Sequence, residues 1–263
     1  DDSRYVRDPA GRALAELTPV AAPGPLLPVG VARLDITPDG PIRLSGYATR
    51  RAESEGVAMK ISAKALAFGS DAQGPAVLIT AELVGVPGWL TDQLAERLAK
   101  KTKVDRAQLA VCATHTHTGP CVKGVLPFIF GESIPAEHQA RIDRYSQQLL
   151  DKLEQLALDA LAKRQPARLA WAQGAVSFAA NRRLLKDGKS AGMGPNPNGP
   201  TDHALPLLRV TSANGELLAM FASYACHCTT LAGDFNQIHG DWAGAALAAL
   251  ERNHPGAVAM FAI

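Results

Sequence analysis

The chain has 263 residues, of which 47% are hydrophobic, and a formal net charge of +2. This length allows one large domain or two small ones with a substantial core, and a charge so near neutrality, with only 5% aromatic residues, gives no basis for nucleic-acid binding. No apolar stretch reaches the ~20 residues that a transmembrane helix needs.

The first part of the chain divides into an extension and a series of strands. Residues 1–27 are polar and then rich in Pro and Ala, which is typical of an N-terminal extension, and residues 28–263 form the ordered domain. Apolar runs bounded by turn residues predict strands over 29–36, 60–68, 76–84 and 108–113, and a helix over 87–103. The order strand, helix, strand at the end of this part indicates a right-handed parallel crossover.

The second part continues the mixture of helices and strands. The pattern predicts loops over 120–135, 186–201 and 229–240, helices over 136–164 and 242–252, and strands over 168–178, 206–210, 217–226 and 258–263. Asn214-Gly215 is a hairpin turn signal, and Asp241 stands where the last helix needs an N-cap. We therefore expect one α/β domain, with a mixed β-sheet core flanked by helices. Because the chain ends inside an apolar strand, we also expect that it is truncated at its C-terminus.

Histidines follow two of the predicted strands. His115 and His117 come directly after the strand over 108–113, and His227 follows the strand over 217–226. Residues two apart in a strand point to the same face, so the first two imidazoles would look out together. A lone histidine in such a place would be explained as a polar residue at the end of a buried strand. If the two strands are neighbours in one sheet, however, three strand-end histidines converge and predict a metal site.

The residues around these histidines indicate metal-assisted hydrolysis. A catalytic zinc takes about three protein ligands and one water, whose pKa it lowers to about 7. Arg182 is placed to hold a carbonyl oxygen or an oxyanion. A carboxylate ligand would come from Glu82, from Asp241 or from residues beyond the end of the chain, although for Glu82 a structural partner is the favoured interpretation.

Two further features flank the histidines. The loop over 120–135 carries Val125, Leu126, Phe128, Ile129 and Phe130, which would either line an apolar substrate pocket or pack against the next helix. The chain has four cysteines that form no C-x-x-C pair, which argues against a structural zinc site: Cys112, Cys121, Cys226 and Cys228. Cys226 and Cys228, which flank His227, are interpreted as small buried residues in preference to a disulfide or a metal role. Neither the G-x-S-x-G motif of serine hydrolases nor a phosphate-binding glycine motif occurs in the chain.

Several short segments follow one another in a characteristic order. They are 29–37 (VGVARLDIT), 45–48 (SGYA), 113–120 (ATHTHTGP), Asn181-Arg182, 221–227, Gly240-Asp241 and Gly244. Together they resemble the N-terminal catalytic domain of the neutral/alkaline non-lysosomal ceramidase family, nearer to its shorter bacterial relatives. The segment ATHTHTGP is the most specific of them, since the family carries ATHTHSGP or a close variant.

The resemblance implies a zinc-dependent amidase (Zn2+) that cleaves the N-acyl amide bond of ceramide-like lipids to a sphingoid base and a fatty acid. It implies that His115 and His227 are zinc ligands, that His117 contacts the reacting amide or its oxyanion, and that Arg182 is the active-site arginine. The family's remaining ligands, a Glu and a Tyr, would lie beyond residue 263.

Alternatives remain at this point. A metal-dependent hydrolase of another amide or ester on the same scaffold, and a non-catalytic ceramidase-like binding domain, both fit the residues. The resemblance implies a small-molecule or lipid substrate, no nucleic-acid partner, an opportunity for peripheral contact with a membrane, and a secreted or periplasmic location; it leaves the oligomeric state open. His239, beside Gly240-Asp241, is either an extra ligand or a loop residue, and we favour the loop residue.

Overall fold

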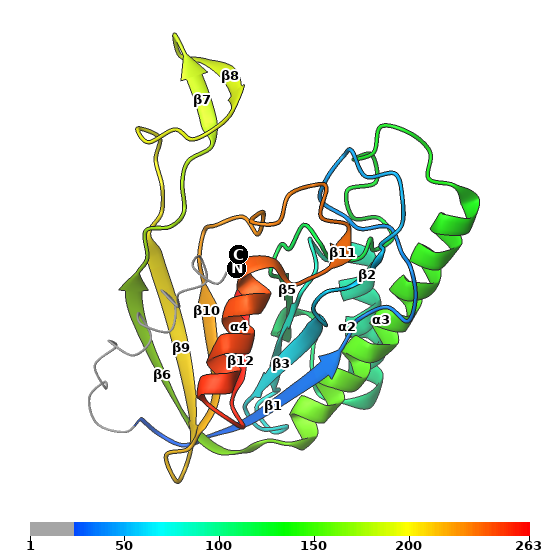
Figure 1. Ribbon diagram of the computed structural model, residues 1–263. Coiled ribbons are helices and arrows are strands. Elements are labelled where there is room, and N and C mark those ends of the chain that lie inside the picture. Colours follow the sequence, from blue (N-terminus) through cyan, green and yellow to red (C-terminus); the bar gives the residue numbers. More distant parts are fainter. Residues whose placement is uncertain (1–23) are drawn as a thin grey trace.

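The computed structural model describes residues 24–263, and most of the predicted N-terminal extension, residues 1–23, lies outside the described residues. Figure 1 shows helices packed around a set of strands. The strands of the main sheet are β1 (Leu27–Asp35), β3 (Ser62–Phe68), β4 (Ala76–Ala81), β5 (Leu109–Ala113), β6 (Gln165–Ala175), β9 (Ala204–Ser212), β10 (Leu217–Ser223) and β12 (Val258–Ala262). The helices are α2 (Gly88–Lys101), α3 (Ala136–Ala162) and α4 (Asp241–Asn253), with a short 3-10 helix at Arg106–Gln108.

The eight strands form one mixed sheet in the order β12-β10-β9-β6-β1-β3-β4-β5. The pairs β4–β5 and β10–β12 are parallel, and the other neighbours are antiparallel. Each parallel pair is joined by a connection that contains a helix, because a tight turn cannot return the chain in the same direction. The predicted α/β fold with a mixed sheet is confirmed, and so is the parallel crossover through α2.

The sheet bends sharply between β1 and β6. Residues 27–29 pair with residues 165–167, whereas β1 pairs with β3 along its length. The two halves of the sheet consequently face each other. Buried apolar side chains from both halves fill the space between them: Val29, Leu66, Ala167, Val210, Ala219 and Met260. Across the same space, Lys64 Nζ on β3 donates a hydrogen bond to the carbonyl oxygen of Ala259 on β12, at 2.7 Å.

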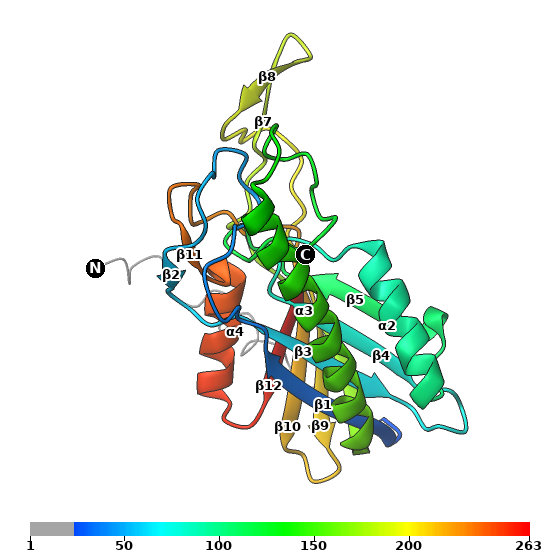
Figure 2. The same ribbon diagram turned by 90° about the vertical axis from the view of Figure 1, so that its right-hand side faces the viewer.

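The helices cover the outer faces of the two halves. Figure 2 shows α4 on one side of the strands, and α2 and α3 on the other. Along α3, Leu149, Leu153 and Leu156 are almost fully buried, and their spacing places them on one side of the helix. In the part of the chain that the structure describes, no helix is long and apolar enough to cross a membrane.

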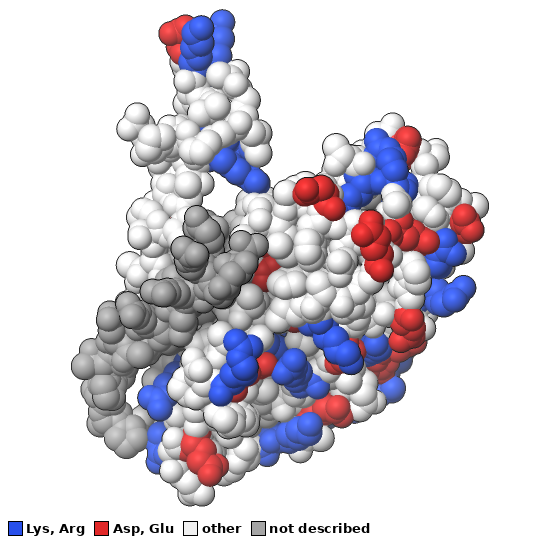
Figure 3. All heavy atoms as spheres, viewed as in Figure 1, with Lys and Arg blue, Asp and Glu red and all other residues white. Residues whose placement is uncertain are grey.

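One predicted loop contains regular structure. Within 186–201, and just before it, β7 (Arg183–Lys186) and β8 (Lys189–Met193) form a hairpin that projects from the body of the molecule (Figure 1). Its turn is Asp187-Gly188, with φ of 52° and 72°, which is the geometry that Asp-Gly favours. The prediction of a loop was wrong here because the exposed strands lack an apolar face, so periodicity did not reveal them. Figure 3 shows charged side chains at the tip of this hairpin.

A small two-stranded sheet was also missed. β2 (Gly56–Val57) pairs in parallel with β11 (Gln237–Ile238), which ties the loop before β3 to the loop before α4. A two-residue strand is too short for any periodicity in the sequence, so only the tertiary contact defines it.

Candidate metal centre

The two histidine segments meet although their strands lie far apart in the sheet. β5, which precedes His115 and His117, is one edge strand, and β10, which precedes His227, lies beside the other edge. Thr116 forms a parallel bridge with Cys228, and the backbone N–H of His117 donates to the carbonyl oxygen of Cys228 at 3.2 Å. The predicted convergence of the histidines is confirmed. The assumption of neighbouring strands is wrong, because the facing halves of the bent sheet bring the two loops together.

His115 and His117 lie in a turn rather than on a strand. β5 ends at Ala113, and His115 has φ 63°, in the left-handed region that residues other than glycine rarely adopt. Surrounding hydrogen bonds hold this conformation: the hydroxyls of Thr116 and Thr118 both donate to the carbonyl oxygen of His239, at 2.9 and 2.7 Å. The predicted strand alternation therefore does not orient the two rings. Backbone strain held by such contacts is typical of functional sites.

The three imidazoles are arranged as metal ligands would be. The nearest ring nitrogens of His115, His117 and His227 all lie within 4.8 Å of one another. Nδ1 of His115 lies 2.6 Å from the carbonyl oxygen of Val84 and must donate to it, so Nε2 of His115 carries a lone pair. That atom lies 3.3 Å from Nε2 of His117. Both nitrogens therefore face one small space, so an ion bound by His115 would have His117 beside it.

Burial favours the neutral form of these rings. It lowers the pKa of His117 to about 4, with smaller contributions from His115 and His227. It also lowers the pKa of His227 to about 4, and the positive charge of Arg182 adds to the effect. Neutral imidazole binds metal ions and imidazolium does not, so these two side chains are in the ligand form at neutral pH.

A glycine and a tyrosine support the ring of His117. Gly46 has φ 97°, and a Cβ atom on it would lie 2.6 Å from Cγ of His117, so only glycine leaves room for the imidazole. The ring of Tyr47 meets the His117 ring edge to face, with centroids 5.1 Å apart. Among the described residues, Nδ1 of His117 has no hydrogen-bond partner. Sequence reasoning quoted this Ser-Gly-Tyr segment only for its resemblance and did not place it at the site.

Two neighbouring arginines lie close enough to the histidines for their charges to act on them, and Arg182 acts on more of them than Arg183 does. The charge of Arg182 acts on both His117 and His227, as their lowered pKa values reflect. The exposed Arg183 lowers the pKa of His227 but is not among the causes for His117, and it contacts the sulfur of Met193 in the β7–β8 hairpin. Arg182 therefore brings a positive charge to the edge of the cluster, at the base of that hairpin.

The family of the chain follows from a sequence comparison. Residues 27–261 match the family described as neutral/alkaline non-lysosomal ceramidase, N-terminal. The chain belongs to this family. No curated protein matches the chain.

Two solved structures share the ceramidase fold of this chain. The neutral ceramidase from Pseudomonas aeruginosa is 25% identical, with a TM-score of 0.72, over 90% of this chain and 38% of its own. A structure described as ceramidase complexed with C2 is 24% identical, also with a TM-score of 0.72, over 90% of this chain and 37% of its own. The chain thus spans less than two fifths of the length of these ceramidases.

The carboxylates considered as further ligands have structural roles in this ceramidase fold. Glu82 is buried and accepts hydrogen bonds from the backbone N–H and the hydroxyl of Ser62, at 2.6 and 2.8 Å. Asp241 begins α4 instead of capping it, and its carboxylate accepts from the N–H groups of Thr230, Leu231 and Trp242. Neither carboxylate joins the histidine cluster.

His239 is a loop residue, as favoured. Its Nδ1 accepts a hydrogen bond from the backbone N–H of Asp241 at 2.9 Å, and its ring is not part of the cluster. All four cysteines are free. Cys228 is buried, as predicted, and donates its thiol to the carbonyl oxygen of Thr114 at 3.0 Å, whereas Cys226 is only half-buried.

The apolar loop after the histidine pair does not act as one surface. Phe130 is buried beneath the guanidinium of Arg43, 4.6 Å from the ring centroid, whereas Phe128 is 89% exposed. Val125 and Ile129 pack against the main core. Most of this loop thus fits the alternative of ordinary packing.

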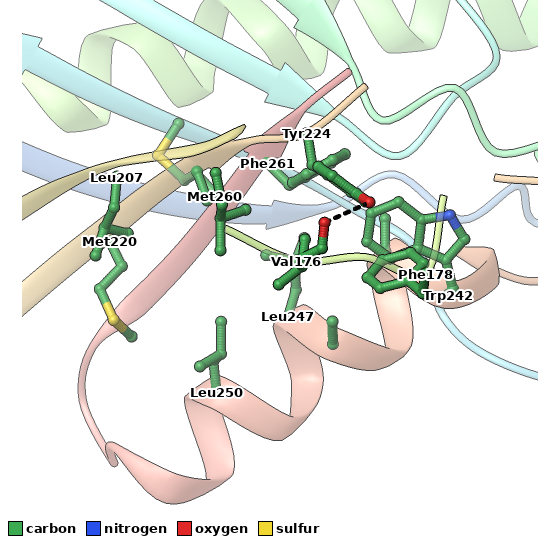
Figure 4. A pocket seen from close by; sticks show the side chains of 14 residues that line it. Val176, Phe178, Leu207, Met220, Tyr224, Trp242, Leu247, Leu250, Met260 and Phe261 are labelled. Carbon is green, nitrogen blue, oxygen red and sulfur yellow. Dashed lines mark hydrogen bonds between the residues drawn. The ribbon is translucent and has the colours of Figure 1, made fainter. Parts of the chain in front are cut away.

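A small apolar pocket lies between α4 and strands β9, β10 and β12 (Figure 4), and most of the side chains that line it belong to the buried core between the helix and the sheet. At one end, the rings of Phe178, Tyr224 and Trp242 meet edge to face. Trp242 Nε1 donates to the carbonyl oxygen of His227 at 3.0 Å, so this aromatic end of the pocket borders the histidine cluster.

Proposed function

We propose that the chain carries part of the active site of a zinc-dependent hydrolase that cleaves the N-acyl amide bond of ceramide-like lipids to a sphingoid base and a fatty acid. The observation that carries this proposal is the convergence of His115, His117 and His227 in a member of the ceramidase family. Because the chain spans 38% of the Pseudomonas enzyme, the activity belongs to the full-length protein.

We assign the zinc to His115 and His227. The hydrogen bond from Nδ1 of His115 to Val84 directs its Nε2 toward the cluster, and such a bond to the other ring nitrogen is typical of histidine ligands. When bound, zinc supplies a Lewis acid and a water of lowered pKa. His117 and Arg182 then act on the substrate.

Arg182 and His117 act on different atoms of the amide. Arg182 binds the carbonyl oxygen and stabilises the negative charge that develops there when water adds to the carbon. His117, neutral at pH 7, accepts a proton from the attacking water and then gives it to the amide nitrogen as the C–N bond breaks and the sphingoid amine leaves. A secreted or periplasmic location remains part of the proposal.

Metal analysis and hydrolysis of two substrates test the proposal. We expect about one equivalent of zinc in the full-length protein, lost in His115→Ala and in His227→Ala, and retained in His254→Ala, whose side chain is exposed. We expect hydrolysis of a fluorescent N-acylsphingosine in preference to short N-acyl amino acids. Zinc content that neither substitution changes would contradict the site. Preference for the short substrates would favour another amidase on the same scaffold.

A further inference from the structure

We propose that Arg50 is a positioning residue for the histidine cluster: its buried guanidinium fixes the backbone of His117 directly and the ring of His117 through Tyr47. The positioning itself stands on the geometry alone, and its consequence for hydrolysis rests on the proposed function.

The guanidinium of Arg50 joins three separate segments of the chain. Arg50 is 4% exposed, and it donates to carbonyl oxygens before the histidine pair, within it, and in the loop before β11. The acceptors are Ser45 at 2.8 Å, His117, Phe235 at 2.9 Å and Gly233 at 3.3 Å. One of these four oxygens belongs to His117, so the guanidinium holds the main chain of this histidine at a defined place.

A second contact runs through the side chain of Tyr47. The Arg50 guanidinium carbon lies 4.8 Å from the centroid of the Tyr47 ring, as in a cation–π pair. The hydroxyl of Tyr47 donates to the carbonyl oxygen of Leu231 at 2.8 Å, which fixes the other end of the ring. The edge-to-face contact between Tyr47 and His117 then limits how the imidazole can turn.

The residue type at position 50 indicates that the side chain serves to position its neighbours and not to stabilise the fold. A buried cation without a carboxylate partner is costly, and among the described residues no carboxylate forms a salt bridge with Arg50. A planar guanidinium presents five N–H groups in fixed directions, and a lysine ammonium cannot reach four oxygens in that arrangement. The energetic cost of burying Arg50 is consistent with a role that depends on the fixed directions of its N–H groups.

A neighbouring arginine provides a matched control. Arg43 is also almost fully buried, donates to the carbonyl oxygen of Arg51 at 2.5 Å and stacks on Phe130. It makes no contact with the ring of His117. Replacing either arginine removes a buried guanidinium, but only Arg50 holds the histidine cluster.

The experiment compares Arg50→Lys, Arg50→Gln and Arg43→Lys in the full-length protein. In the metal-free protein, the nuclear Overhauser effect between the rings of His115 and His117, assigned with His117→Gln, reports whether the rings still face each other. We expect this signal to be lost in both Arg50 variants and retained in Arg43→Lys. Hydrolysis of the fluorescent N-acylsphingosine should fall about 10- to 100-fold in the Arg50 variants and stay unchanged in the control. Zinc content should stay unchanged in all three variants, because His117 acts on the substrate and is not a zinc ligand.

The two readouts separate the proposals. If the wild-type protein binds no zinc, the proposed function fails, and the ring signal still decides the role of Arg50. If both Arg50 variants keep the signal, or if neither folds while Arg43→Lys does, Arg50 is merely structural and the positioning role is wrong. Arg50→Gln serves as a second variant because it removes the buried charge. It can therefore fold even if the buried ammonium group of Arg50→Lys prevents folding.

Discussion

At the scale of single residues, the histidine cluster depends on backbone positions that tolerate few side chains. His115 occupies the left-handed region although it is not glycine, and Gly46 occupies it where the His117 ring passes. The cluster is therefore shaped by conformational strain and close approach as well as by its ligating side chains. Sequence reasoning singled out the three histidines and Arg182 as candidate site residues, because their side-chain chemistry suits metal binding and the stabilisation of negative charge. It did not identify Arg50, because an arginine in a polar stretch looks like any solvated side chain.

The close approach at Gly46 leads to a prediction. We expect Gly46→Ala to lower the free energy of unfolding by about 1–3 kcal/mol, because its φ is left-handed and its Cβ would overlap the His117 ring. Urea denaturation measures the change. Gly40→Ala is the control: nothing lies within 4 Å of its Cβ position, so we expect a change within about 0.5 kcal/mol. Equal stability of the two variants would mean that Gly46 is not constrained by the histidine.

At the scale of elements, a buried ion pair links the two halves of the sheet. Lys64 on β3 is 3% exposed and lies 2.8 Å from the carboxylate of Glu251 on α4, in addition to its hydrogen bond to β12. Burial lowers the pKa of Lys64, and the charge of Glu251 opposes that shift. The pair thus joins α4 to the half of the sheet that it does not cover. Its partners are 187 residues apart in the chain, so no local pattern could predict it.

Removal of the carboxylate should leave the lysine charge uncompensated. We expect Glu251→Gln to destabilise the protein by about 3 kcal/mol in urea denaturation, because Lys64 would stay buried without its partner. The exposed pair between Lys60 and Asp35 is the comparison, and Lys60→Met should cost less than about 1 kcal/mol. Similar costs for both variants would show that the interior pair is hydrated.

At the scale of the whole molecule, the bend of the sheet creates the site. The facing halves bring the loop after β5 against the loop after β10, and the backbone N–H of Ile263 lies 3.4 Å from the carbonyl oxygen of Ala113. The buried cluster between the halves, which includes Leu66 and Met260, holds this arrangement. The position of His227 relative to His115 is consequently a property of the sheet's curvature, and neither loop could set it alone.

The contribution of the contact between the two halves of the sheet to stability can be tested at Leu66. We expect Leu66→Ala to lower the free energy of unfolding by about 2–5 kcal/mol, because Leu66 is fully buried and its removal leaves a cavity. Leu185→Ala, in the projecting hairpin, should change it by about 0.5 kcal/mol or less, since that side chain is 64% exposed. Urea denaturation compares the two. A small effect of Leu66→Ala would mean that the halves are held by the loops instead.

Local patterns in the sequence determined most of the elements. Apolar periodicity and turn residues predicted the main strands and helices to within a few residues, because neighbours along the chain carry those signals. The histidine motif and the segments around it also indicated the ceramidase family, which the comparison confirmed.

Only the tertiary structure decided how the site is assembled. It showed that His115 and His117 lie in a strained turn, that Glu82 and Asp241 bind backbone and hydroxyl groups, and that the loops meet across a bent sheet. It also placed Arg50 against His117. The physical reason is common to all of them: each depends on contacts between residues distant in sequence, whose energies no local stretch of the chain contains.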